Sequence, residues 1–326
     1  MRASGAILLV ACYELGHQPL NLASPLAMLR RAGFSPIAVD TSVTELSDDA
    51  IAAAQLVAIS APMHTALRLG THIAARVRAL NPNAHICFYG LYATLNADYL
   101  LRTIADSIIG GEYEEALLAL AEAHTSAHGG APDAIPGVRT RNHDALPVLR
   151  RLAYAAPERA SLPTPQSYAY LVRGDEMVPA GYVEATRGCL HTCAHCPITP
   201  VYGGRFFAIP RPLVLEDIRA QVRAGVGHIT FGDPDFLNGP RHSLEIVRAM
   251  HAEFPDVTFD ATIKVEHILE RREVFPELAA LGCAFVVSAV ESLSKGVLRH
   301  LKKGHSRADV AEALEILDGA GIPMRP

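Results

Sequence analysis

The chain has 326 residues, of which 50% are hydrophobic and 19% charged, and its formal net charge is −5. This composition can bury a sizeable core, and the negative charge argues against the basic surface of a nucleic-acid-binding protein. No apolar run approaches the ~18 residues that a membrane span needs. We therefore expect a small-molecule substrate and neither a nucleic-acid nor a membrane partner.

The chain opens without the charged and apolar regions of a signal peptide, because residues 6–12 read as a buried strand. Six cysteines in a chain of this length then indicate reduced thiols and not disulfides. The sequence predicts a cytoplasmic protein.

Residues 1–124 alternate short apolar runs with amphipathic stretches, which is typical of a parallel sheet covered by helices on both faces. Strands are predicted at 6–12, 36–40, 56–60, 85–89 and 107–109. Helices are predicted at 24–32, 66–80, 97–103 and 113–123. Such sheets bind ligands at the carboxyl ends of their strands, where Ser60, Gly110 and Gly111 lie. A G-x-G-x-x-G fingerprint is absent from the sequence, which argues against a nicotinamide site.

Residues 125–180 are turn-rich and weakly periodic, as in an interdomain connection. We therefore predict a first domain at 1–124, a linker at 125–180 and a second domain at 181–326. A first strand at 181–186 opens the second domain, and helix–strand units follow it. Helices are predicted at 213–224, 241–253, 272–281 and 307–320, and strands at 227–232, 257–265 and 283–290, with a further strand beginning at 321–323.

The loop after the first strand of that domain carries Cys189, Cys193 and Cys196 in a C-x3-C-x2-C spacing. A [4Fe–4S] cluster takes one thiolate per iron, so three thiolates hold it and leave one iron open to a small ligand. The alternative is a structural zinc ion completed by His191 or His195, although zinc loops more often pair C-x2-C with a second, distant pair of ligands.

The remaining three cysteines, Cys12, Cys87 and Cys283, lie in apolar runs. A free cysteine in such a run is usually a small core residue. We expect none of the three to bind the cluster.

The cysteine spacing resembles the signature of the radical S-adenosylmethionine (SAM) superfamily. The resemblance implies that SAM chelates the open iron, that an electron from the cluster breaks one of its C–S bonds, and that flavodoxin or ferredoxin supplies the electron. It also implies a (β/α) barrel of six units. This chain stops where the fifth strand should form, so we expect a partial barrel and a longer natural protein.

The resemblance implies SAM contacts at Gly232, Asp233, Lys264, Ser288, Glu291 and His195. Gly232 and Asp233 stand where relatives carry a GGE-type motif that receives the SAM amino group, with an Asx or proline turn as the alternative. Lys264 is a candidate partner of Glu291 or of the SAM carboxylate.

Two further matches concern the rest of the SAM molecule. Ser288 and Glu291 resemble the segment that approaches the ribose and methionine portions, and a buried Glu291 would need a ligand or cation as partner. His195 occupies the position from which relatives place an aromatic ring on adenine.

Residues 81–90 and 105–112 resemble the cobalamin-binding domain that precedes many radical SAM barrels. The cobalt-ligating pattern D-x-H-x-x-G is absent from the first loop, where His17 follows Gly16. A histidine below cobalt is therefore not expected. A Rossmann-like domain that binds no corrin remains the alternative, because a fold can outlive its function.

Three hypotheses for the reaction follow from these resemblances. Similarity to radical SAM proteins with a Cys- or selenocysteine-rich tail implies transfer of a SAM-derived carbon group, specifically 3-amino-3-carboxypropyl to trivalent arsenic. The second hypothesis is cobalamin-dependent methyl transfer. The third is a sensor that uses its iron–sulfur cluster or cobalamin without SAM turnover.

Overall fold

The computed structural model describes residues 4–125 and 131–326. Two compact units make up the chain, Met1–Tyr168 and Ala169–Pro326. The division falls within the predicted linker 125–180, of which residues 126–130 lie outside the described part. The predicted domain limits at 124 and 181 stay predictions.

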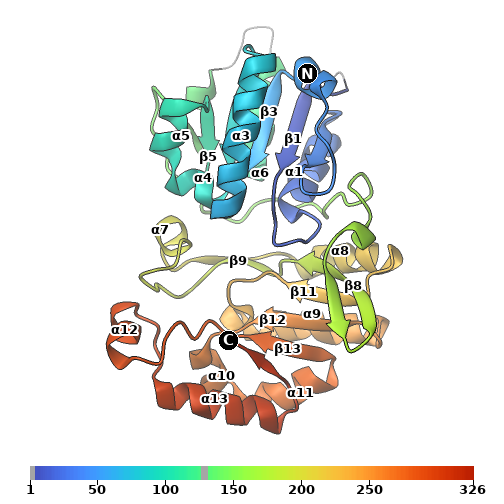
Figure 1. The fold of residues 1–326 in the computed structure, drawn as a ribbon, viewed down its shortest axis with the longest axis vertical. Helices are drawn as coiled ribbons and strands as arrows, with labels where there is room; N and C mark the ends of the chain where they lie inside the picture. Colours follow the sequence, from blue (N-terminus) through green and yellow to red (C-terminus); the bar gives the residue numbers. More distant parts are fainter. Residues whose placement is uncertain (1–3, 126–130) are drawn as a thin grey trace. The chain divides into compact units, whose positions relative to one another are not determined.

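The first unit is built on one sheet (Figure 1). Its strands are β1 (Ile7–Ala11), β2 (Ile37–Asp40), β3 (Leu56–Ser60), β4 (His85–Tyr89), β5 (Ser107–Ile109) and β6 (Val138–Thr140). They lie in the order β2-β1-β3-β4-β5-β6, and all pairs are parallel except β5 with β6. The antiparallel edge strand β6 is as short as β5, but it was not predicted because it lies in the stretch 125–180 that was interpreted as a linker.

Helices cover both faces of this sheet. They are α1 (Leu20–Arg31), α2 (Asp48–Ala53), α3 (His64–Leu80), α4 (Leu91–Leu95), α5 (Ala97–Thr103) and α6 (Glu114–Thr125), with short 3-10 turns η1 (Pro132–Ala134) and η2 (Pro165–Ser167). Successive strand residues point to opposite faces. Leu9 of β1 accordingly packs with α1 and α6, whereas Val10 packs with α2 and α3. The predicted Rossmann-like fold is confirmed.

Helix α1 begins at Leu20, before the predicted start at residue 24, and it contains Pro25. Proline lacks the N–H that would bond to the carbonyl four residues earlier, so the carbonyl of Asn21 is left without its helical donor. The hydroxyl of Tyr89, at the end of β4, donates to that carbonyl at 2.7 Å. This contact between β4 and α1 satisfies the carbonyl that Pro25 leaves without a donor, and so helps to stabilise the helix.

The second unit contains a curved sheet and a separate two-stranded ribbon. Its strands are β7 (Tyr170–Arg173), β8 (Glu176–Val183), β9 (Thr186–Gly188), β10 (Phe206–Ala208), β11 (His228–Phe231), β12 (Thr258–Thr262), β13 (Cys283–Val287) and β14 (Met324–Arg325). The sheet has the order β14-β13-β12-β11-β8-β7, and β9 pairs with β10 in the ribbon. Strands β8 and β11 to β14 are parallel, and β7 forms an antiparallel edge.

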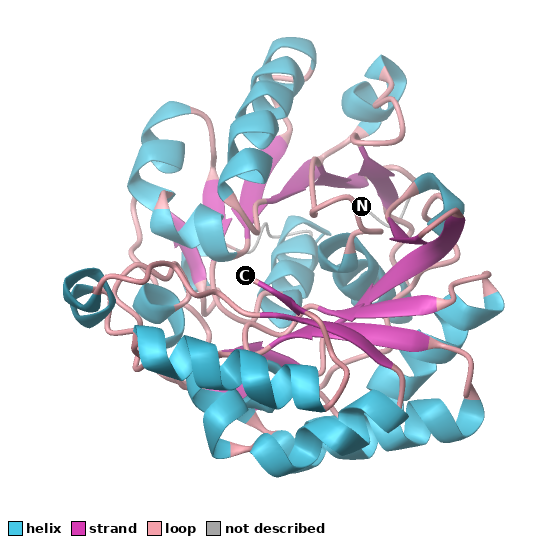
Figure 2. Ribbon diagram, turned by 60° about the horizontal axis from the view of Figure 1, so that its bottom comes forward, coloured by secondary structure: helices cyan, strands magenta, loops and turns pink. Residues whose placement is uncertain are grey.

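The helices of the second unit are α7 (Thr199–Tyr202), α8 (Arg211–Arg223), α9 (Pro240–Glu253), α10 (Val265–Glu270), α11 (Phe275–Ala280), α12 (Lys295–His300) and α13 (Arg307–Gly319), with 3-10 turns η3 (Phe236–Asn238) and η4 (Arg272–Val274). Helices α8, α9, α10, α11 and α13 pack on one face of the sheet (Figure 2). Ile229 and Phe259 from the strands pack with Ile246 of α9 in a single core. This is the predicted partial barrel.

Three predicted strands of this unit end early, and the one predicted at 283–290 stops at Val287. The first was predicted at 181–186, but β8 stops at Val183 and the chain enters the ribbon through β9. The strand predicted at 257–265 stops at Thr262, and Val265 begins α10. Apolar and β-branched residues continue through these breaks, so periodicity could not show them. Among the described residues, no helix is both long and apolar enough to cross a membrane.

Candidate functional site

The cysteine loop leaves the end of the β9–β10 ribbon. Gly188, the last residue of β9, has φ +79°, and a Cβ there would lie 2.4 Å from the carbonyl oxygen of Arg205. Only glycine fits both the conformation and the close approach. The next residue, Cys189, donates its N–H to that carbonyl at 3.0 Å. The ribbon therefore fixes the direction in which the first cysteine enters the loop.

Hydrogen bonds also hold the middle of the loop. The carbonyl of Cys193 accepts from the N–H of Cys196 at 3.2 Å and from the hydroxyl of Thr199 at 3.0 Å. Ala194 donates its N–H to the carbonyl of Leu301 at 2.9 Å. These bonds satisfy the backbone and leave the sulfur atoms to a ligand.

Cys189, Cys193 and Cys196 are free thiols, the first two buried and the third partly exposed. Three thiols in one loop can each bind a different iron of a [4Fe–4S] cluster, which leaves the fourth iron open.

Asn238 in η3 contacts the first cysteine. Its Oδ1 accepts from the N–H of Leu190 at 3.3 Å and lies 3.9 Å from the Sγ of Cys189. Its Nδ2 is buried and has no hydrogen-bond partner among the described residues. Burial raises the pKa of the Cys189 thiol. A positively charged iron site would favour the thiolate and so fits this position.

Asp233, predicted to receive the SAM amino group, is turned into the protein. Its Oδ1 accepts from the hydroxyl of Thr186 at 2.6 Å and its Oδ2 from the N–H of Ala185 at 3.0 Å. Burial raises the pKa of Asp233 to about 7, although these hydrogen bonds oppose the shift. The carboxyl group thus holds the link between β8 and β9, immediately before the cysteine loop.

Gly232 is also explained by a contact within the chain. A Cβ at this position would lie 2.0 Å from the ring of Tyr182 on β8. The Tyr182 hydroxyl lies 3.5 Å from the Gly232 carbonyl oxygen. The missing side chain therefore makes room for Tyr182, and the predicted SAM contact stays a prediction.

Glu291 is exposed and lies beside a histidine and a lysine. Its Oε1 lies 3.1 Å from the Nε2 of His195 and 3.6 Å from the Nζ of the buried Lys303. Its φ of +64° is unusual for a residue with a side chain. The structure thus joins two predicted SAM residues, His195 and Glu291, and the predicted partner Lys264 is replaced by Lys303.

Lys264 lies in another group of polar residues. Its Nζ is 2.9 Å from the Nδ1 of His191 and 2.8 Å from the Oε2 of Glu266. Glu266 is only two residues away, at the start of α10, so it provides the nearest carboxylate. The sequence analysis did not identify Glu266.

Asp235 joins the same group from the loop after β11. Its Oδ2 lies 2.8 Å from the Nδ1 of His267 and 3.3 Å from the Nε2 of His191. Burial by itself would raise the pKa of Asp235, but the two imidazoles lower it to about 2. The motif Gly-Asp-Pro-Asp was a visible signal for Asp235, whereas nothing in the sequence marked His267.

Ser288 is fully buried just after β13. Its Oγ has no hydrogen-bond partner within the described residues. A buried hydroxyl without a partner is costly unless a ligand or water satisfies it. Ser288 Oγ and Asn238 Nδ2 are thus among the unsatisfied polar atoms that this part of the domain offers to a bound molecule.

In the first unit, the predicted cobalamin residues lie at strand ends, but the chain itself packs against them. Ser60 is buried at the end of β3. A Cβ on Gly110 would lie 2.4 Å from the Thr94 hydroxyl, and one on Gly111 would lie 2.2 Å from the Val148 carbonyl oxygen. These packing contacts account for both glycines, and their contact with cobalamin stays a prediction.

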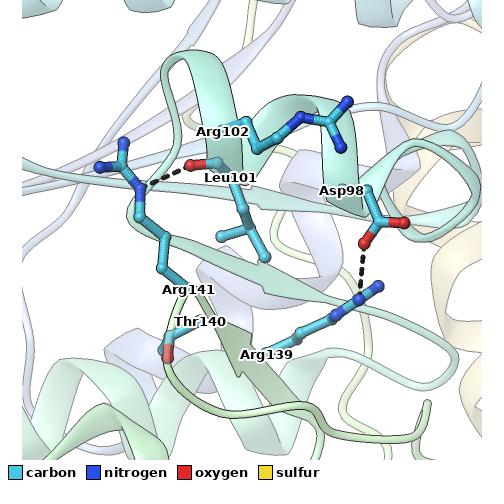
Figure 3. Close-up of a pocket in the computed structure, with 6 residues that line it drawn as sticks. All are labelled: Asp98, Leu101, Arg102, Arg139, Thr140 and Arg141. Atoms are coloured by element: carbon cyan, nitrogen blue, oxygen red, sulfur yellow. Dashed lines mark hydrogen bonds and ion pairs between the residues drawn. The ribbon is translucent and has the colours of Figure 1, made fainter.

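A hollow of about 400 Å³ lies elsewhere in the first unit (Figure 3). Two of its arginines contact the chain itself. Arg139 pairs with Asp98 at 2.6 Å and with Asp144 at 2.8 Å, and Arg141 donates to the carbonyl of Leu101 at 2.5 Å. We assign this hollow no ligand.

Two family profiles match the chain, one in each unit. Residues 6–121 match the B12 binding domain and residues 183–324 match the radical SAM superfamily. The chain carries a B12-binding domain followed by a radical SAM domain. A radical SAM domain uses a [4Fe–4S] cluster and SAM, and a B12-binding domain uses cobalamin. These are the three cofactors that the sequence analysis expected.

Curated relatives of the two domains include two methyl-transferring enzymes. The hopanoid C-3 methylase of Methylococcus capsulatus is 26% identical over 68% of this chain and 42% of its own length. The bacteriochlorophyllide d C-12(1)-methyltransferase of Chlorobaculum tepidum is 31% identical over 40% of this chain and 28% of its own length. The chain thus spans less than half the length of either relative.

Solved structures share the fold of both domains. The methyltransferase TsrM of Kitasatospora setae, with cobalamin and a [4Fe–4S] cluster bound, has a TM-score of 0.75 and 19% identity and covers 99% of this chain and 66% of its own. The cobalamin-dependent SAM radical enzyme OxsB has a TM-score of 0.74 and 16% identity and covers 98% of this chain and 48% of its own.

Proposed function

We propose that this chain is part of a cobalamin-dependent radical SAM enzyme that transfers a methyl group to a small molecule. The observation that carries the proposal is the presence of a B12-binding domain and a radical SAM domain with its cysteine loop in one chain. Two curated relatives with methyl-transfer names support the same class of reaction. The proteins described above lend no support to transfer to arsenic.

When bound, the cluster supplies the electron that cleaves a C–S bond of SAM, and cobalamin supplies methyl-transfer chemistry. The chain holds the cluster through Cys189, Cys193 and Cys196. Asp233 acts as a positioning residue, because it ties the strand before the loop to the end of β11. A reductant such as flavodoxin or ferredoxin is part of the proposal.

For SAM itself we propose contacts with His195, Ser288 and Glu291. The pairing of His195 with Glu291 and the unsatisfied hydroxyl of Ser288 support this assignment. Gly232 and Lys264 already contact other residues of the chain. We therefore propose that they shape the site.

The products of SAM distinguish the candidate reactions. After anaerobic reconstitution with iron, sulfide and hydroxocobalamin, the full chain is incubated with SAM and a reductant, and the products are identified by mass spectrometry. Methyl transfer from SAM leaves S-adenosylhomocysteine, and reductive cleavage leaves 5′-deoxyadenosine. Accumulation of 5′-methylthioadenosine would instead indicate aminocarboxypropyl transfer. A chain that binds its cofactors and yields none of these products would be a sensor.

A further inference from the structure

His191, Asp235 and His267 form a compact group at the carboxyl edge of the partial barrel. Asp235 follows β11, His267 lies on α10 after β12, and His191 belongs to the cysteine loop. One ligand atom from each residue lies within 4.8 Å of the other two. Barrel enzymes place their chemistry at this edge.

The three facing atoms make no hydrogen bonds within the described part of the chain. Asp235 is 0% exposed, and its Oδ2 has no hydrogen-bond donor even though two imidazole nitrogens lie 2.8 and 3.3 Å away. His191 Nε2 and His267 Nδ1 are likewise without a hydrogen bond. The imidazoles face the carboxylate as ion-pair partners without well-directed hydrogen bonds, so the three atoms are placed to share one further partner.

A cation between the three atoms would satisfy all of them at once. We propose that His191, Asp235 and His267 bind a divalent first-row transition-metal ion that is separate from the iron–sulfur cluster. Two imidazoles and one carboxylate are a common ligand set for catalytic zinc and for non-haem iron(II), and three protein ligands leave at least one coordination position open. The proposal rests on these side chains and not on the proposed methyl transfer.

Neighbouring groups orient two of the ligands. Asp235 Oδ1 lies 3.3 Å from the N–H of Leu237, which caps η3 and fixes the carboxylate. On the far side of the His191 ring, Nδ1 faces Lys264 at 2.9 Å and Glu266 at 3.8 Å. A metal on Nε2 requires a proton on Nδ1. Lys264, itself a donor, would then have to turn away from Nδ1 and keep Glu266, at 2.8 Å, as its partner.

A simple hydrogen-bonded network looks different in the same domain. His228 Nε2 lies 2.9 Å from Asp260 Oδ1, and His228 Nδ1 lies 2.8 Å from the hydroxyl of Thr258. Thr230 donates to the same Asp260 oxygen at 2.7 Å. Both ring nitrogens are satisfied there, so that pair needs no cation.

The test uses zinc as the probe and the cluster-loaded full chain under anaerobic conditions. After equilibration with Zn²⁺ and removal of the excess by gel filtration, zinc and iron are counted by mass spectrometry, and the zinc environment is measured by X-ray absorption. We expect one retained zinc, unchanged iron and a shell of nitrogen and oxygen at ~2.0–2.1 Å. No retained zinc, or sulfur ligands at ~2.3 Å, would overturn the proposal.

Variants locate the ion. Asp235→Asn and His267→Ala should lose the retained zinc and keep the cluster iron. The matched control His300→Ala removes an exposed histidine on α12 and should keep both. The triple variant Cys189→Ala, Cys193→Ala, Cys196→Ala should lose iron and keep zinc. Circular dichroism checks that Asp235→Asn is folded, and retention of zinc by the folded variant would contradict the site. If the variant misfolds, the X-ray absorption data on the unmodified chain decide whether nitrogen and oxygen atoms bind the zinc.

Discussion

The radical SAM domain contains two groups of histidine and aspartate side chains. In one group the facing atoms are hydrogen-bonded, and in the other they are not. His228 and Asp260 lie on β11 and β12, where Thr258 and Thr230 on the same pair of strands satisfy them. His191, Asp235 and His267 lie beyond the strand ends, and the described chain gives their facing atoms no hydrogen bond.

The difference follows from position on the sheet. Neighbouring strands supply fixed cross-strand partners, so polar residues within the sheet can satisfy one another. Loops beyond the strand ends have no such ladder, and their side chains are available to ligands. We therefore expect substitutions within the strands to affect stability and substitutions in the strand-end loops to affect binding.

The largest expected effect is in the cysteine loop. Replacing Cys189, Cys193 or Cys196 by alanine should abolish stable cluster binding, because each thiolate holds one iron. Cys283→Ala, in strand β13, should keep its cluster iron. Iron and sulfide analysis after anaerobic reconstitution measures the cluster content of each variant. Loss of iron from Cys283→Ala would show that a strand cysteine also contributes to cluster binding.

Asp233 tests the comparison between strand and loop residues, because it follows strand β11 but its carboxylate is buried and bonded within the chain. Its pKa is raised from 3.8 to about 7, so the folded state binds a proton that the unfolded state releases between these values. The stabilisation is complete below pH 3.8 and declines as pH rises through 7, by roughly 4 kcal/mol at most, since one pKa unit is about 1.4 kcal/mol.

Urea unfolding from pH 4 to 8 tests this contribution. The free energy of unfolding of the unmodified chain, relative to Asp233→Asn, should fall across that range. Asparagine is the matched variant, since it keeps the size of the side chain and cannot ionise. A difference that stays constant with pH would show that Asp233 does not titrate there.

Within the sheet, His228→Ala should lower the free energy of unfolding by ~1–3 kcal/mol, because it removes the buried partner of both Asp260 and Thr258 and leaves Thr230 as the donor to Asp260 Oδ1. Its cluster iron should be unchanged. In the metal-free chain, His267→Ala should cost less, because its Nδ1 makes no hydrogen bond among the described residues. Equal losses in the two variants would remove the distinction that we draw between the groups.

The smallest effect is predicted for Ser288. Ser288→Ala should weaken SAM binding about two- to twelve-fold, which corresponds to the ~0.5–1.5 kcal/mol of one hydrogen bond, and should not lower stability. The control Ser243→Ala removes a buried hydroxyl that donates to the carbonyl of Phe236 at 2.5 Å, and it should lower stability without changing SAM affinity. Calorimetric titration with SAM and urea unfolding measure both; unchanged SAM affinity in Ser288→Ala would remove Ser288 from the site.

Much of the fold could be predicted from periodicity. Strands β3, β4 and β5 and helix α5 have the predicted limits, because compact apolar runs are bounded by clear turns. Edge strands β6 and β7 and the β9–β10 ribbon were missed. Strands β6 and β7 lie in the turn-rich stretch interpreted as a linker, and the pairing of β6 and of the ribbon depends on residues distant in the sequence.

The sequence by itself was enough to predict the cysteine loop as a cluster site, because three thiols within eight residues lie close together in any fold that turns the loop. Only the tertiary structure decided the partners of the other polar residues. Asp233 turned inward and Glu291 paired with Lys303. Asp235 approached His267, which lies on another βα unit, as no local spacing could indicate. Long-range contacts of this kind depend on how parallel strands align their carboxyl ends.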